Sequence, residues 1–135
     1  DNQQLELING TKEIAKGVWV EPAPGPTSGH QMVIVDGLEI TQAFLGVLVP
    51  TPMHLCMNVA TAFDWDPDET TTTKKILLKR ALSEKWMIGP VGRDHWVTAD
   101  QAMAVSSSDP VNATALLGQP KQEPVRAKVG VGARS

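Results

Sequence analysis

Apolar and polar positions follow a period of two along several short stretches, which is the pattern of strands with one buried face. The clearest stretch begins with an apolar, β-branched run over residues 31–36. That run ends at Asp36-Gly37, a dipeptide typical of two-residue hairpin turns. Residues 38–41 then resume with an apolar side chain at every second position. The pattern predicts a β-hairpin over this part of the chain.

Other stretches have the same period or fit short elements. Residues 13–21 predict a strand with a kink at Gly17. Residues 53–65 keep apolar side chains at alternate positions, which predicts a long half-buried strand. A helix competes there, because Ala and Met are good helix formers. Residues 95–98 fit a short strand, and residues 111–117 fit either a strand or a helical turn.

Residues 74–88 have a helical period instead. Large apolar side chains recur every four positions, and the segment contains neither Gly nor Pro. This pattern predicts a helix over residues 74–85, with Asp68 or Thr70 as its N-cap. Two short strands within the same segment are the alternative.

The composition changes this picture by its large number of chain breakers. The 135 residues fit one ordinary domain, and they include 11 Gly and 10 Pro. Such breakers make long helices unexpected and favour short strands joined by turns. The predicted fold is mainly β: a small antiparallel sandwich or barrel over residues 1–118, with one short helix. Residues 119–135 contain little that could build a core, and they predict an extended C-terminal arm.

Charge and cysteine content exclude several classes of protein. The formal net charge is −3, so the chain lacks the basic field of a nucleic-acid-binding protein. A single cysteine, Cys56, excludes an internal disulfide and with it a disulfide-stapled secreted domain. No apolar run approaches the roughly 18 residues of a membrane span. The first residue is Asp1 rather than Met, which indicates a processed, truncated or renumbered chain.

An acidic cluster over residues 64–69 is the first candidate metal site, because carboxylates at alternate positions can converge on a calcium ion. The calcium-binding EF-hand pattern fails, however, since Glu69 stands where that loop requires Gly and Lys75 where it requires Glu. The cluster is therefore interpreted as a solvated turn that caps the next element.

His54 and Cys56, with His30 and His95 elsewhere, form a candidate zinc set. No Cys-x-x-Cys pair supports it, so a small buried thiol and satisfied or exposed histidines are the preferred interpretation. A nucleophilic pair of Cys56 with a histidine lacks the local signatures of cysteine proteases. No phosphate-binding loop and no serine nucleophile elbow occur. The sequence therefore assigns no catalytic residue, no metal and no cofactor.

The four tryptophans could form a sugar-binding platform, but they are also most of the aromatic bulk available. We therefore expect most of them in the core or at subunit interfaces. The basic residues of the arm leave a weak nucleic-acid contact open.

The absence of enzyme motifs, together with a stiff Pro-rich loop and an extended arm, favours a structural assembly protein. The expected class is a coat, cement or decoration subunit of a virion or phage particle. Its expected partners are copies of itself or another structural subunit; a membrane is not expected, and the sequence identifies no small-molecule ligand. The residues expected to make the assembly contacts are Pro22, Pro24, Pro26, Val125, Arg126, Val129 and Val131.

Two hypotheses from other classes stay open. One is a small β-barrel hydrolase or lyase that uses His30, His54 or His95 as a base. Two of these histidines in one cleft with Asp36, Asp64 or Asp94 would favour it. The other is a sugar- or peptide-binding module, for which exposed coplanar tryptophans would be the sign.

Overall fold

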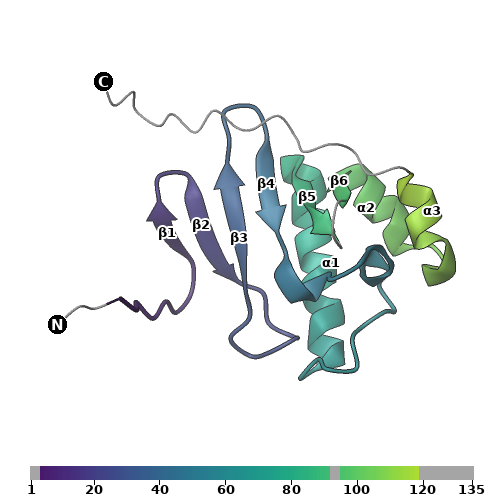
Figure 1. Ribbon diagram of the computed structural model, residues 1–135, viewed down its shortest axis with the longest axis horizontal. Coiled ribbons are helices and arrows are strands. Elements are labelled where there is room, and N and C mark those ends of the chain that lie inside the picture. Colours follow the sequence, from purple (N-terminus) through teal and green to yellow (C-terminus); the bar gives the residue numbers. More distant parts are fainter. Residues whose placement is uncertain (1–3, 92–94, 119–135) are drawn as a thin grey trace.

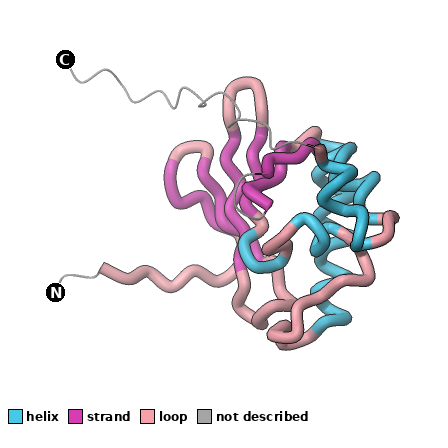
Figure 2. Tube along the Cα trace, turned by 45° about the vertical axis from the view of Figure 1, so that its right-hand side comes forward, coloured by secondary structure: helices cyan, strands magenta, loops and turns pink. Residues whose placement is uncertain are grey.

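A mixed β-sheet with helices on one side is the framework of the chain (Figures 1 and 2). The computed structural model describes residues 4–91 and 95–118. In this part the strands follow one another across the sheet in sequence order. They are β1 (Lys12–Ala15), β2 (Val18–Pro22), β3 (Gln31–Asp36), β4 (Thr41–Phe44), β5 (Met87–Val91) and β6 (His95–Thr98). Neighbouring strands are antiparallel except β4 and β5, which are parallel.

The helices follow β4 and β6. They are α1 (Pro67–Glu84), α2 (Ala99–Ser106) and α3 (Ala113–Leu117), with 3-10 turns η1 (Gly46–Leu48), η2 (Pro52–Leu55) and η3 (Pro110–Asn112). The connection from β4 to β5 contains α1, because a parallel pair needs a long crossover. None of the described helices is long and apolar enough to cross a membrane.

One face of the sheet packs against the helices and forms the core. Its side chains alternate along the strands, and Met32, Ile34, Ala43, Ile88 and Val97 are all at most 4% exposed. Helix α1 contributes Leu77, Leu78 and Ala81 to the same core. The opposite face is half-buried and also apolar; on it Phe44 and Trp96 meet edge to face, with ring centroids 5.3 Å apart.

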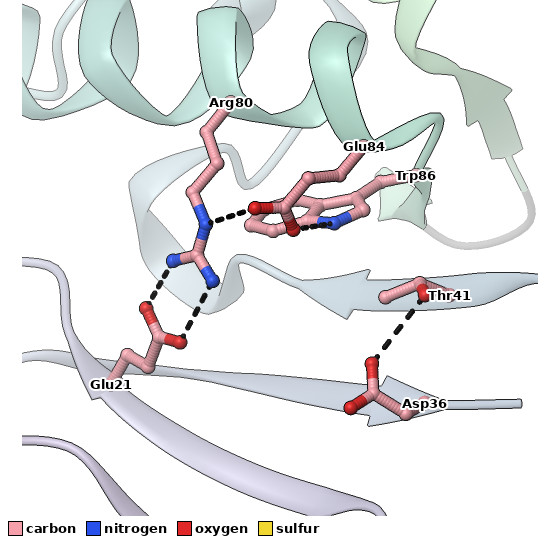
Figure 3. Close-up of polar contacts among 6 residues, drawn as sticks. All are labelled: Glu21, Asp36, Thr41, Arg80, Glu84 and Trp86. Carbon is pink, nitrogen blue, oxygen red and sulfur yellow. Dashed lines mark hydrogen bonds and ion pairs between the residues drawn. The ribbon is translucent and has the colours of Figure 1, made fainter.

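Local chemistry explains where α1 begins and ends. The Asp66 side chain accepts a hydrogen bond from the Glu69 amide, and Pro67 occupies the first helical position. The helix ends at Lys85, whose left-handed backbone (φ 55°) closes the last turn. Arg80 of α1 also binds Glu21 of β2, which ties the helix to the sheet (Figure 3). The predicted helix is thus confirmed, but it is longer and is capped by Asp66.

The predicted β-sandwich or barrel is wrong. The sheet is open and mixed, and an 18-residue helix lies against it. The breakers misled because they gather in loops such as residues 22–29, whereas residues 68–88 contain no Gly or Pro. The total number of Gly and Pro residues does not show that they lie in the loops and are missing from the helical segment.

Two predicted strands are also wrong. Residues 13–21 form the hairpin β1–β2, because Gly17 takes a positive φ of 74° and turns the chain. Residues 53–65 form η2 and an irregular segment. Three carbonyls of that segment accept hydrogen bonds from the Lys74 ammonium instead of from a neighbouring strand.

The remaining predictions are mostly confirmed. The hairpin after Asp36 exists as β3–β4, although β4 begins at Thr41 and Leu38 is exposed in the loop. Residues 95–98 form β6, and residues 111–117 contain the short helix α3. The predicted arm over residues 119–135 lies outside the described residues.

Candidate functional site

One end of the sheet lies next to two of the histidines, His30 and His95. The loop from β2 to β3, the start of the segment after β4 and the first residue of β6 lie at this end, whereas the β3–β4 hairpin lies at the other (Figure 1). His30 closes the first of these loops, His54 lies in η2, and His95 begins β6. In open α/β sheets, ligands usually bind beyond the carboxyl ends of parallel strands, which here are β4 and β5.

The loop between β2 and β3 is fixed to the start of α1. The amides of Trp65 and Asp66 donate to the carbonyls of Pro26 and Gly25, each at 3.0 Å. The hydroxyl of Thr73 donates to the carbonyl of Pro24 at 2.7 Å. The backbone of this loop is therefore held against the start of α1.

The prolines predicted as assembly contacts lie at the start of this loop and within it. Pro22 is exposed at the end of β2, Pro24 is half-buried, and Pro26 is buried within its own chain. Their contacts with another copy stay a prediction. The other four assembly residues, Val125, Arg126, Val129 and Val131, lie outside the described residues.

His30 stabilises the same loop. Its Nδ1 lies 2.8 Å from the carbonyl oxygen of Ala23, and a carbonyl can only accept, so Nδ1 carries the proton. The backbone amide of Ala23 donates in return to the carbonyl of His30 at 2.8 Å. His30 is therefore a loop-closing residue.

His54 is the histidine best placed for chemistry. Its Nδ1 lies 2.7 Å from the hydroxyl of Thr51, and its side chain is half-buried. Burial lowers the pKa of His54 below its usual value, the Lys74 ammonium lowers it further, and the Asp64 carboxylate acts in the opposite direction. The imidazole is consequently neutral near pH 7 and can accept a proton.

Asp64 supplies the negative charge near His54. Its Oδ1 accepts a hydrogen bond from the Thr61 hydroxyl at 2.6 Å, and its Oδ2 accepts one from the Thr61 amide at 3.3 Å. These bonds hold the carboxylate within a tight turn.

The other two aspartates of the histidine-base hypothesis are not placed beside His54. Asp36 lies at the far end of the sheet, bound by Thr41 (Figure 3), and Asp94 is outside the described residues.

Cys56 is not a nucleophile in this arrangement. Its side chain is fully buried, and its thiol donates to the carbonyl of Val105 at 3.3 Å. The interpretation of Cys56 as a small buried thiol is confirmed.

The four tryptophans differ in how exposed they are: Trp86 is buried in the core, Trp19 and Trp96 are half-buried, and Trp65 is 80% exposed. The described residues therefore present no row of exposed indoles.

The sequence did not single out Lys74, which is 1% exposed. The spacing Thr70, Lys74, Leu77, Ala81 could have placed it on the buried face of a helix, since these positions are three or four apart.

Comparisons with known proteins identify the fold. No protein-family model matches the chain, and no curated protein matches it. A solved structure of a probable metal-dependent hydrolase from Staphylococcus aureus matches with a TM-score of 0.66 and 17% identity, over 71% of this chain and 35% of that one. The fold is part of the metallo-β-lactamase fold.

An N-acyl homoserine lactone hydrolase, solved with the product N-hexanoyl-L-homoserine at its catalytic metal centre, matches with a TM-score of 0.56 and 24% identity. The match covers 62% of this chain and 34% of that one. The chain thus spans about a third of the length of these structures. At such identities the likeness shows the fold alone.

These comparisons contradict the predicted coat, cement or decoration subunit, because the matching structures are hydrolases. The alternative of a hydrolase with a histidine base agrees with them better, although the barrel expected for it is absent. The assembly prediction relied on missing enzyme motifs. A site built from separated loops has no contiguous motif to find.

The metal centre of the lactone hydrolase has no counterpart among the described side chains. In residues 4–91 and 95–118, no three His, Cys, Asp or Glu side chains are grouped closely enough to hold a metal ion. Asp66 of the predicted acidic cluster caps α1, and Asp64 is bound by Thr61. The side chains of this part of the chain therefore do not fit a metal centre by themselves.

Proposed function

We propose that this chain is the part of a hydrolase that binds a lactone or other ester and supplies His54 as the general base. The proposal is supported by a half-buried imidazole whose pKa is lowered by burial, in a chain that shares its fold with a probable metal-dependent hydrolase and a lactone hydrolase. The fold alone would not give the reaction, since one fold serves many chemistries.

The chemistry assigned to His54 follows from its hydrogen bond. Thr51 can accept as well as donate, and in the tautomer that donates Nδ1–H to its hydroxyl, Nε2 keeps its lone pair and can accept a proton from water. The water oxygen then bonds to the carbonyl carbon of the ester, and the carbon–oxygen bond to the leaving alkoxide breaks. The proton held on Nε2 returns to that alkoxide, which restores the neutral imidazole. Asp64 stabilises the transient positive charge.

The test is hydrolysis of an N-acyl homoserine lactone and of a simple aryl ester by the full chain, with and without a chelator. His54→Gln removes the base, and we expect a loss of about 10²-fold or more in kcat. Asn58→Ala, an exposed change in the same segment, is the matched control and should keep the rate. Thermal unfolding of each variant shows that the fold is intact.

Two results would overturn the proposal. One is hydrolysis by a folded His54→Gln variant at the rate of the unsubstituted chain. The other is the absence of any hydrolysis of either substrate above the spontaneous rate.

A further inference from the structure

Lys74 is a buried lysine that uses all its donors on one irregular segment. Its Nζ donates to the carbonyls of His54 at 3.1 Å, Cys56 at 2.8 Å and Val59 at 2.5 Å. An ammonium has three donors, so these bonds satisfy it completely. The side chain is 1% exposed, so these carbonyls rather than bulk water are its partners.

The three carbonyls belong to a segment that is itself neither strand nor α-helix, and its Met57 amide donates to the carbonyl of Ser106 in α2 at 3.1 Å. Residues 54–59 leave η2 and run towards α1, and their carbonyl groups need partners once they are buried. A buried ammonium equally needs compensation, because an unpaired buried charge is very costly. Helix α1 and the segment carrying His54 are thus joined chiefly through Lys74, beside a 3.4 Å hydrogen bond from the Thr71 hydroxyl to the Met57 carbonyl.

The same ammonium contributes to the electrostatics of His54. Lys74 and Asp64 are the charges that act on its imidazole. Helix α2 and the turn η3 also pack against η2, and their titratable groups are Asp100 in α2 and Asp109 just before η3. Burial lowers the pKa of Lys74, while Cys56 and Asp64 act in the opposite direction.

We propose that Lys74 is a positioning residue: its ammonium fixes the backbone that carries His54 and places a positive charge 3.1 Å from the carbonyl oxygen of that residue. Its importance for turnover rests on the function proposed above for His54. The geometric role does not, because it is a property of the folded chain alone.

The experiment is an NMR titration of the imidazole of His54, whose signal is identified by its loss in His54→Gln. In Lys74→Met the titration midpoint should move to higher pH, because the nearby positive charge is gone. Lys75→Met, which removes an exposed lysine one position away, should leave the midpoint unchanged. Amide exchange over residues 54–59 should also rise by about tenfold or more in Lys74→Met only.

A second measurement covers the case in which Lys74→Met does not fold. In the unsubstituted chain, the Nζ protons of Lys74 should exchange with water much more slowly than those of Lys75, because three carbonyls hold them. Equal exchange of the two lysines would overturn the proposal. An unchanged His54 midpoint in a folded Lys74→Met variant would overturn it as well. Neither readout requires turnover, so a chain without lactonase activity would contradict the proposed function and leave the role of Lys74 standing.

Discussion

Arg80 of α1 and Glu21 of β2 form a two-point ion pair between the helix and the sheet, with Nη1–Oε2 at 2.5 Å and Nη2–Oε1 at 3.1 Å (Figure 3). The Nε of Arg80 also donates to Glu84 at 3.0 Å, and the guanidinium lies 4.8 Å from the ring centroid of Trp86. Glu84 in turn accepts from the Trp86 indole at 2.8 Å. The planar guanidinium therefore joins the sheet to the end of the helix with fixed geometry.

Arg80→Met should lower the free energy of unfolding by about 1 kcal/mol or somewhat more, because the carboxylate of Glu21 would lose its partner while only 16% exposed. The value stays modest because Arg80 itself is 37% exposed and solvent screens the pair. Urea unfolding measures the change. Lys79→Met removes an exposed cation from the adjacent position and should have almost no effect. Equal stability of the two variants would contradict a structural role for the pair.

Gly25→Ala should be strongly destabilising, by about 3 kcal/mol or more. Gly25 has a φ of 138°, and a Cβ there would lie 2.4 Å from the Thr70 hydroxyl and 2.5 Å from its Cα. The loop and the first turn of α1 would have to separate. Gly29→Ala is the matched control, since a Cβ at that position meets nothing within 4 Å. Thermal unfolding compares the two, and a mild effect at Gly25 would show that the loop is not tightly apposed to α1.

Asp66→Ala should cost about 1 kcal/mol, because the amide of Glu69 would lose its side-chain acceptor at the start of α1. Asp66→Asn should retain most of the stability, since Asn is an equally good N-cap. Denaturant unfolding with circular dichroism measures both variants. If the Asn variant is as unstable as the Ala variant, charge rather than capping holds the start of the helix.

The sequence predicted the elements whose signals are local. Asp36-Gly37 marked the β3–β4 hairpin, and the four-residue spacing marked α1. The parallel pairing of β4 with β5 could not be predicted in this way. It joins Ala43 to Ile88, and nothing near either residue indicates a partner so far along the chain. Without that pairing, the open sheet could not be distinguished from a sandwich.

The site was predicted in part. His54 and Asp64 were named as candidates, because base and carboxylate chemistry depends on residue type. Their proximity to Lys74 comes from α1 crossing over the segment after β4, which is a tertiary relationship. The alternation of apolar residues in that segment was accidental, since Met53 is 42% exposed and Leu55 is fully buried. The period of two therefore predicted a strand, whereas three backbone carbonyls of this segment bond to the Lys74 ammonium and not to a neighbouring strand.

The pH dependence of stability should carry the signature of His54. Its pKa in the folded chain lies below the usual 6.5, so between these two values the unfolded chain binds more protons than the folded one. The contribution of His54 to stability therefore rises with pH across this interval and is complete above about pH 6.5. Urea unfolding at about pH 5 and about pH 7.5 should show a smaller difference for His54→Gln than for the unsubstituted chain. Asn58→Ala, which leaves the imidazole in place, should keep the full difference. An identical difference in all three proteins would mean that folding does not disfavour the charged imidazole, and His54 would then lose the neutral state on which its role as a base depends.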